Sequence, residues 1–582
     1  FMAGNFLACA ATRAAEREKT LSIAYMPQII SYLAMNMRLA PNLERAVEFA
    51  ANHGKGKIAD DFKKLIWDVQ IGKYATLEEG LDTLAYKWGN YNDDFKHSLM
   101  LIRTAVLEGD KVKYEQLLDI AVEDVLEGSK EKMDVFARQL HQPTVYLYYF
   151  GILLPLMLAI VLPMAASMAG GVFGNPLLFV GIYNVFLPVF IYVFGLSILG
   201  NRPPTYIAPE IPSDFPGLPK KGVGDFFGVK LPYAPLALIV LIAIIFVGYS
   251  IDAARVAAIK ADISVLEPEK ALEAIPSIVL PVFNATVYFA TILSAIIGFG
   301  AAAAVYLYGR FNARKKIQDE IRAMETEFKD AIYILASRLG ENRPMEDALR
   351  HAIEFLPKSG VAKNIFKRIL ENITMLGMTL DAAIFDKNYG AIKFLPSDVI
   401  QSGMRLMVDS VQLGVNVAAR SLINLSLQIR NTQKIDDMLK KLLSDVTSML
   451  STMGTFIAPI VLGVVTSLQQ VIVNSLTANC PTAEATAANA ASQVGSLSGS
   501  GGLASMFCGS GEASKISPAF FTLIMGVYVI EVVILLTYFN SQIEDPKNKL
   551  YSAISISKAL PVATILFALV AFFAASFLGG IG

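Results

Sequence analysis

Charged residues are scarce in this chain of 582 residues: Asp, Glu, Lys and Arg make up 17% of it, against 54% hydrophobic residues. A soluble globular protein carries about 25% charged residues. The shortfall argues against an ordinary soluble domain and favours several membrane spans, each of which needs about 20 consecutive apolar residues. The formal net charge of -1 gives no basic excess, so the charge balance offers no support for binding to nucleic acid.

Residues for metal or nucleophilic chemistry are equally sparse. The three cysteines form no CxxC pair and the four histidines are scattered, so their spacing predicts no metal site. The sequence has no GxxxxGK[ST] phosphate-binding loop, no HExxH and no GxSxG. We therefore expect no catalytic residue, no metal and no cofactor, and we predict that the chain is not an enzyme.

Long apolar runs are what the sequence does contain. Charge-free runs of this length are rare in soluble cores and typical of membrane-crossing helices. The charged residues crowd into two other segments, Arg13–Arg138 and Arg310–Asp445, in which the apolar residues have helical spacing. The sequence thus predicts an all-α, polytopic membrane protein with about seven transmembrane helices and two charged helical-bundle domains. The predicted spans are Tyr146–Met168, Leu177–Leu199, Tyr233–Ile251, Ile278–Tyr308, Gly454–Val473, Ala519–Phe539 and Ala559–Leu578.

These segments divide the chain into four predicted parts. Two helical domains alternate with two groups of spans, and the three longest loops between spans are given with them. The parts are the first domain at 1–142, four spans at 143–308 with a Pro-rich loop at 200–232 and an outside loop at 252–276, the second domain at 309–450, and three spans at 451–582 with an outside loop at 474–518.

The basic residues near the span ends predict the orientation, because Lys and Arg concentrate on the cytoplasmic side. Lys315 and Lys316 follow the fourth span, and the 200–232 loop is also rich in Lys and Arg. The 474–518 loop has a single Lys, and acidic residues outnumber basic ones in 252–276. We therefore expect a multi-pass protein of the cell membrane, with both charged domains in the cytoplasm and the C-terminus outside.

Two cysteines, Cys480 and Cys508, lie in the predicted outside loop, which is otherwise rich in Ala, Ser and Gly. Extracytoplasmic compartments permit disulfides, and a bond here would limit the entropy of a long flexible loop. The sequence predicts such a disulfide, and two free thiols are the alternative.

The two charged domains resemble each other in sequence. Residues Leu33–Ala50 match Leu335–Ala352, with the apolar positions and the acidic residues Glu44 and Glu346 in step. Further matches follow in the same order at a spacing of about 302 to 305 residues, so we predict that one helical domain is present twice. They join Phe62-Lys63-Lys64-Leu65 to Phe366-Lys367-Arg368-Ile369, Thr76-Leu77-Glu78 to Thr379-Leu380-Asp381, Gly109 to Gly414, and Pro155 to Pro459.

The repeat also aligns residues 1–11 with the end of the fourth span, near residues 303–313. We therefore expect that the chain begins inside a leading span whose start lies upstream of Phe1. A gene that starts at Met2 would contradict this expectation.

With two such domains, each followed by a span, the chain resembles the platform proteins of type IV pilus-like machines, which carry the type II secretion F domain. The resemblance covers nearly the whole chain, and the number of spans is most similar to the archaeal branch, with the archaellum platform first and adhesion-pilus platforms nearly as similar. The segments in which the resemblance is clearest are Leu33–Ala50, Leu335–Ala352 and the Glu108-Gly109 turn. The second copy has Gln412 near the matching place, and this departure puts an acid-dependent role there in doubt.

This resemblance implies a mechanism without bond chemistry on the chain. A cytoplasmic hexameric secretion or archaellum ATPase would dock beneath the platform, which would move pilin or archaellin subunits from the membrane lipid into a filament. It also implies a homodimer. The alternatives within this class are an adhesion pilus and a protein secretion system. Outside it, a transporter would place its repeats and polar sites in the spans, and a membrane enzyme would need a cluster of His, Asp or Glu there.

Nine residues are the candidates for specific roles. Glu531 lies near the middle of the sixth span, where a carboxylate is costly and indicates function by default; the alternative is a protonated Glu bonded to a neighbouring span. The other eight are basic residues that would meet an acidic ATPase surface, or that reflect cytoplasmic topology and solvated helix faces. They are Arg310, Arg314, Lys315, Lys316, Arg322, Lys363, Lys367 and Arg368.

Overall fold

The computed structural model is helical almost throughout the residues that it describes, which confirms the all-α prediction. Among these residues the strands form one hairpin, β1 (Val223–Phe226) with β2 (Val229–Pro232), inside the segment predicted to be a plain loop. The described residues are 22, 25–39, 41–54, 56–169, 176–199, 229–265, 289–478 and 518–579, with some of those between 209 and 226.

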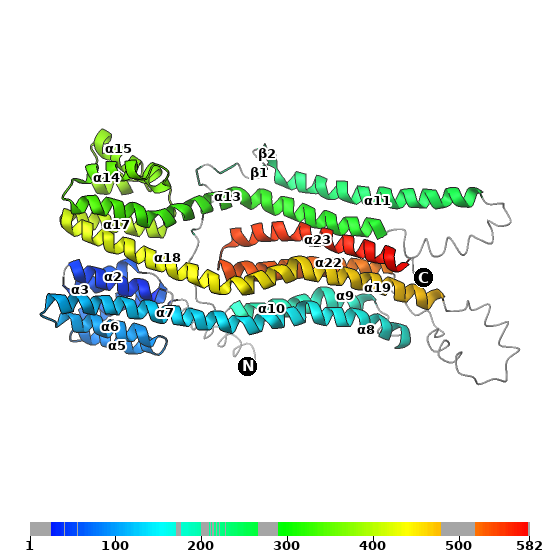
Figure 1. Cartoon of the computed structure of the whole chain (residues 1–582), viewed down its shortest axis with the longest axis horizontal. Helices are drawn as coiled ribbons and strands as arrows, with labels where there is room; N and C mark the ends of the chain where they lie inside the picture. The colour runs from blue at the N-terminus through cyan, green and yellow to red at the C-terminus, as the bar shows by residue number, and fades with distance from the viewer. Residues whose placement is uncertain are drawn as a thin grey trace.

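Two helical bundles lie at the same end of the molecule (Figure 1). The first contains α2 (Met26–Leu39), α3 (Leu43–His53), α4 (Gly56–Gln70), α5 (Leu77–Gly89), α6 (Asp93–Val106) and the first part of α7 (Lys111–Tyr148). The second contains the last part of α13 (Phe289–Gly340), α14 (Met345–Phe355), η5 (Ala362–Phe366), α15 (Lys367–Leu376), α16 (Leu380–Phe385), α17 (Asp398–Gln412) and the first part of α18 (Val415–Thr452).

Several short helices in each bundle begin after a residue whose side chain caps them. Thr76 and Thr379 precede α5 and α16, and each hydroxyl accepts the backbone N–H three residues ahead at 3.4 Å. Asn92 and Ser397 cap α6 and α17 in the same way and are both buried. A cap of this kind satisfies a backbone donor that the helix itself leaves unpaired.

Each bundle buries one apolar face of its helices, and the buried residues of the two bundles form a common core. In α3 the buried positions include Leu43, Ala46, Val47 and Ala50, and in α14 they are Met345, Ala348, Leu349 and Ala352. Both sets have the spacing of one helix face, as the sequence predicts. Helix α18 contacts α2 and α7, and the buried apolar residues of both bundles join into a single cluster.

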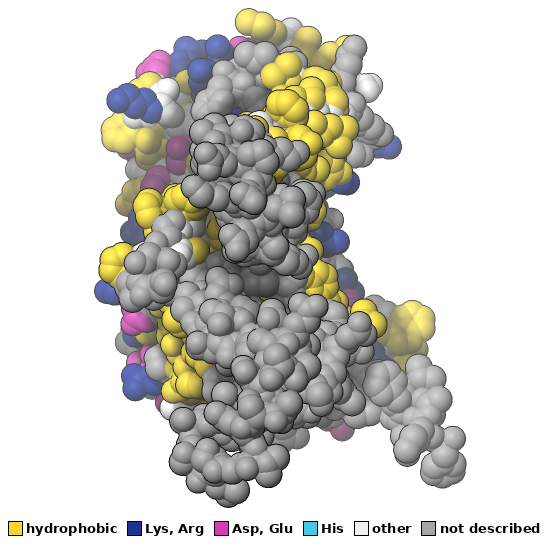
Figure 2. Space-filling view, turned by 90° about the vertical axis from the view of Figure 1, so that its right-hand side faces the viewer, with side chains coloured by type: hydrophobic (Ala, Val, Ile, Leu, Met, Phe, Trp, Pro, Cys, Tyr) yellow, Lys and Arg dark blue, Asp and Glu magenta, His cyan; other side chains and the backbone are white. Residues whose placement is uncertain are grey.

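Seven helices in the described part of the chain are long and apolar enough to cross a membrane, in agreement with the predicted number. The most buried of them is α22 and the least buried is α11. Viewed from the end opposite the bundles, much of the described surface is hydrophobic, and Lys and Arg show mainly around the rim (Figure 2). The spans lie in α7–η1–α8 (Leu154–Ala169 for α8), α9–η3–α10 (Pro176–Val180, Gly181–Phe186, Leu187–Leu199), α11 (Tyr233–Val265), α13, α18–η6–α19 (Ala458–Ala478 for α19), α22 (Pro518–Glu544) and α23 (Lys549–Gly579).

The predicted outside loop at 252–276 is wrong at its start, because α11 continues as helix to Val265. Asp252, which suggested a loop, is buried, and its Oδ2 accepts the Thr291 backbone N–H at 2.7 Å and the Thr291 hydroxyl at 2.6 Å. These donors lie in the first turn of α13, so a charged side chain is stabilised within a helix pair.

Three very long helices connect the bundles with the spans. The first junction helix runs through α7, the π-turn η1 (Tyr149–Leu153) and α8, and the second through α18, the π-turn η6 (Met453–Ile457) and α19. The third, α13, has 52 residues and is about 78 Å long at 1.5 Å per residue. Figure 1 shows all three running from the bundles into the group of spans.

Candidate functional site at the junction of bundles and spans

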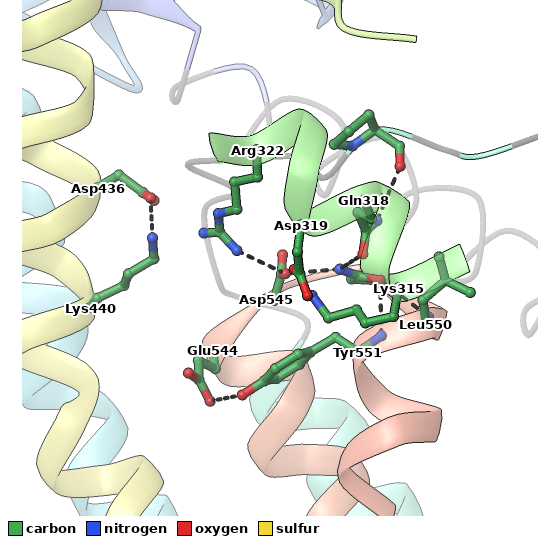
Figure 3. A network of polar contacts seen from close by, with 12 residues as sticks. Lys315, Gln318, Asp319, Arg322, Asp436, Lys440, Glu544, Asp545, Leu550 and Tyr551 are labelled. Carbon is green, nitrogen blue, oxygen red and sulfur yellow. Dashed lines mark hydrogen bonds and ion pairs between the residues drawn. The ribbon is translucent and has the colours of Figure 1, made fainter. Parts of the chain in front are cut away.

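Buried polar side chains gather where α13 passes the turn between α22 and α23 (Figure 3). Asp545, in this turn, is only 4% exposed, and its Oδ2 lies 3.5 Å from Nη1 of Arg322 on α13. The Asn548 amide donates to the same oxygen of Asp545 and to Oε1 of Gln318, both at 2.9 Å. We call these four residues the junction network.

Asn548 lies at the centre of this network, and it also caps the helix that follows it. Its Oδ1 accepts the backbone N–H groups of Leu550 and Tyr551 at 3.1 Å, which caps α23. Gln318 extends the network to the segment after α10 by donating to the Pro209 carbonyl at 3.1 Å. One buried cluster therefore links α13, the α22–α23 turn and the 200–232 segment.

Several of the basic residues predicted on α13 have partners within the chain. Lys315 pairs with Asp319 and lies over the Tyr551 ring, 5.4 Å from its centroid. Arg322 belongs to the junction network, and Arg310 donates to the Tyr306 hydroxyl at 2.9 Å. Arg314 and Lys316 lie on the same stretch of α13. These five residues thus lie close to the spans; Arg314, Lys315 and Arg322 are partly buried, and Arg310 and Lys316 are exposed.

The other three predicted basic residues lie elsewhere. Lys363, Lys367 and Arg368 are exposed on η5 and α15, in the part of the second bundle that lies away from the first bundle (Figure 1). Lys367 forms only a loose pair with Glu371, at 3.9 Å. The structure therefore does not bring the eight predicted residues into one surface.

The residues that marked the repeat have local structural roles. Glu44 and Glu346 are exposed in the first turns of α3 and α14, where a negative charge stabilises the helix N-terminus. Both α7 and α18 have 38 residues, and the residues before them are Asp110 and Gly414. Gly414 directly precedes α18 as Asp110 directly precedes α7, and Gly109 lies one residue before Asp110.

The turn that contains Glu108 and Gly109 is also longer than its counterpart. Glu108 accepts the Asp110 backbone N–H at 3.2 Å, which orders this turn, and Asp110 in turn caps α7. In the second bundle only Leu413 and Gly414 separate α17 from α18. Gly414 has a φ of 115°, which favours glycine.

Each junction helix has a π-turn followed by a proline, Pro155 or Pro459, and α22 contacts both turns. Pro155 has no N–H, so the Gly151 carbonyl lacks its helical donor. The Tyr528 hydroxyl of α22 donates to this carbonyl instead, at 2.8 Å. At the second turn, a Cβ added to Gly454 would lie 3.2 Å from Cβ of Leu536. Helix α22 thus supports the point at which each junction helix departs from regular α-geometry.

Glu531 lies on α22, between Tyr528 and Leu536, and is partly exposed. Cys480 and Cys508, which the sequence predicts to form a disulfide, lie outside the described residues. Within the described ranges no group of three or more His, Cys, Asp or Glu side chains has the arrangement of a metal site.

Sequence reasoning missed the junction network and Tyr528. The 545–548 turn carried one usable signal, an Asn directly before an apolar helix, which is typical of an N-cap. No local signal joins Asp545 to Arg322 or Tyr528 to Gly151, because these partners are more than two hundred residues apart in the sequence.

Comparison with known proteins adds no relative. No protein-family model matches the chain, and no curated protein or solved structure gives a significant match. The function must therefore be argued from the geometry and the sequence.

Proposed function

We propose that this protein is the membrane-embedded platform of a type IV pilus-like machine of the archaeal kind, which couples a cytoplasmic hexameric ATPase to the insertion of subunits into a filament. The observation that carries the proposal is the continuity of α13 and of the two junction helices. Each joins a bundle to a span without a loop. A displacement of the bundles is therefore transmitted to the spans as a movement of stiff helices.

The proposal includes a duplicated bundle. The paired helices support it: α3 and α14 have 11 residues each, α7 and α18 have 38, and the π-turns have five. Each bundle also has an Arg–Asp pair between corresponding helices, Arg103–Asp82 and Arg405–Asp381. Duplication explains why both bundles lie at one end of the spans, which we assign to the cytoplasm from the distribution of Lys and Arg.

In this mechanism the chain binds, transmits and positions but makes no bonds. The motor pushes the second bundle, and the junction network ties α13 to the α22–α23 turn so that these spans move together. The π-turns allow small changes in angle at the membrane boundary, because such turns interrupt the regular helical hydrogen bonds. We further propose that two copies assemble, as the resemblance implies, and that archaellin subunits are the cargo.

The side of the second bundle that faces away from the first bundle is the proposed motor-docking surface. Lys363, Lys367 and Arg368 are exposed there, and Phe355 and Met375 are 64% and 80% exposed nearby. Basic residues around exposed apolar ones suit an acidic partner surface with its own apolar contacts, because opposite charge guides association and apolar burial holds the complex. The basic residues on α13 lie beside the spans, several of them with partners within the chain, and are assigned to the junction.

Charge reversal tests this docking surface. Replacing Lys363, Lys367 and Arg368 together by Glu should weaken binding of the neighbouring gene's ATPase to the purified full chain by at least about tenfold, through like-charge repulsion. Lys63→Glu with Lys64→Glu, on the exposed face of α4 at the matching place of the first bundle, is the control and should leave binding nearly unchanged. Binding by the triple variant equal to that of the original chain would refute the assignment.

A further inference from the structure

One face of α22 is less covered than the rest of this helix. Leu523 is 37% exposed, and every third or fourth residue after it is partly exposed, while Met525, Tyr528 and Val532 are buried. A spacing of three or four residues keeps side chains on one side of a helix. We call this face the α22 stripe, and it consists of Leu523, Val527, Glu531, Leu535 and Tyr538.

Glu531 is the only ionisable group at the middle of the stripe and is the central residue of the 27-residue helix. Its Oε2 is buried, and no hydrogen-bond donor in the described part of the chain reaches it. A carboxylate within a membrane is costly unless a partner compensates it. Protonation removes the charge, but a carboxylic acid still has a donor and acceptors to satisfy.

In the described part of the chain Glu531 forms no ion pair, and Lys558, the basic residue within the neighbouring span α23, is exposed. The sequence of α22 contains neither Lys nor Arg, and the Arg322–Asp545 ion pair lies at the C-terminal end of this helix, away from Glu531. Lipid tails have no donors. The compensating group must therefore come from a molecule that covers the stripe.

We propose that the α22 stripe binds one transmembrane helix of a partner polypeptide, an apolar helix that carries a single ammonium group at the depth of Glu531. Leu523, Val527 and Leu535 supply the apolar contact. Glu531 supplies the opposite charge, and a charged hydrogen bond in a dry environment is among the stronger polar contacts. The partner would lie one turn from Tyr528, which holds the first π-turn.

This site can be tested without a motor or a filament, so its failure would leave the proposed function untouched. The purified full chain is placed in phosphatidylcholine nanodiscs with either of two synthetic 24-residue Leu–Ala helices, one with Lys at its centre and one with Leu. Binding is followed by energy transfer between labels on the peptide and the chain. The Lys helix should bind about tenfold tighter than the Leu helix, a difference within the range of a compensated intramembrane charge.

Three variants make the result specific. Glu531→Leu should remove the preference for Lys, and Glu531→Gln should retain only a small part of it. Phe246→Ala is the control, since Phe246 is 67% exposed on α11 and lies on a different helix. Equal binding of the two peptides, or a preference for Lys that survives in Glu531→Leu, overturns the proposal. So does Glu531-dependent pairing of two copies of the chain without peptide binding.

Discussion

Lys434→Pro is expected to abolish filament assembly while the protein remains in the membrane. Lys434 is exposed on α18 between Ile429, which packs in the core shared by the bundles, and Leu439, which packs in the core of the spans. Proline removes a helical hydrogen bond, clashes with the preceding turn and costs about 3 kcal/mol inside a helix. The second junction helix would break between its two packed parts, and the bundle would no longer move the spans.

The measurement is the number of surface filaments per cell, counted by electron microscopy, with membrane-bound protein measured in parallel. Lys434→Ala is the matched control, because it removes the same side chain and leaves a good helix former. It should assemble filaments normally. Normal filament numbers in the proline variant, at normal protein level, would show that continuity of this helix is not used.

Asp545→Ala is expected to lower the free energy of unfolding by about 1–3 kcal/mol and to reduce filament assembly strongly. Asp545 is nearly buried and faces both Arg322 and Asn548, so its removal takes one buried acceptor from a partly buried guanidinium and from an amide. The α22–α23 turn would then no longer be fixed to α13. Unfolding of the full chain in detergent measures the first effect and filament counts measure the second.

An exposed pair of the same chemistry provides the control for this prediction. Arg405 and Asp381 lie 3.2 Å apart, and both side chains are about half exposed. Asp381→Ala should cost less than about 1 kcal/mol, because water screens such pairs. A double-mutant cycle on Arg322 and Asp545 that gives no more coupling than the cycle on Arg405 and Asp381 would contradict the role given to the junction network.

The sequence predicted those parts of the fold that depend on local pattern. The helix face of Leu43, Ala46 and Val47 is set by periodicity, and the number of spans by the length of apolar runs. The sequence was less informative about where a span ends when a single charged residue was the only indication. Asp252 suggested a loop, yet it is buried in a helix, because Thr291 on a neighbouring helix provides its donors.

Most of the candidate site could not be predicted from the sequence. The basic residues on α13 were found from their charge, but charge alone did not separate Arg322, which has a buried partner, from Lys367, which faces solvent. The hydrogen bond from Tyr528 to the Gly151 carbonyl forms only because α22 packs beside the first π-turn in the folded chain. The one indication in the sequence was Pro155, which has no N–H to donate to the carbonyl four residues earlier.

The central claim is that this chain is a platform without which the filament cannot be assembled. Its most direct test is deletion of the gene, followed by electron microscopy of surface filaments and by detection of filament subunits in the membrane fraction. We expect cells without filaments whose subunits remain in the membrane, with recovery when the gene is restored. Filaments at the original number in the deletion strain would contradict it.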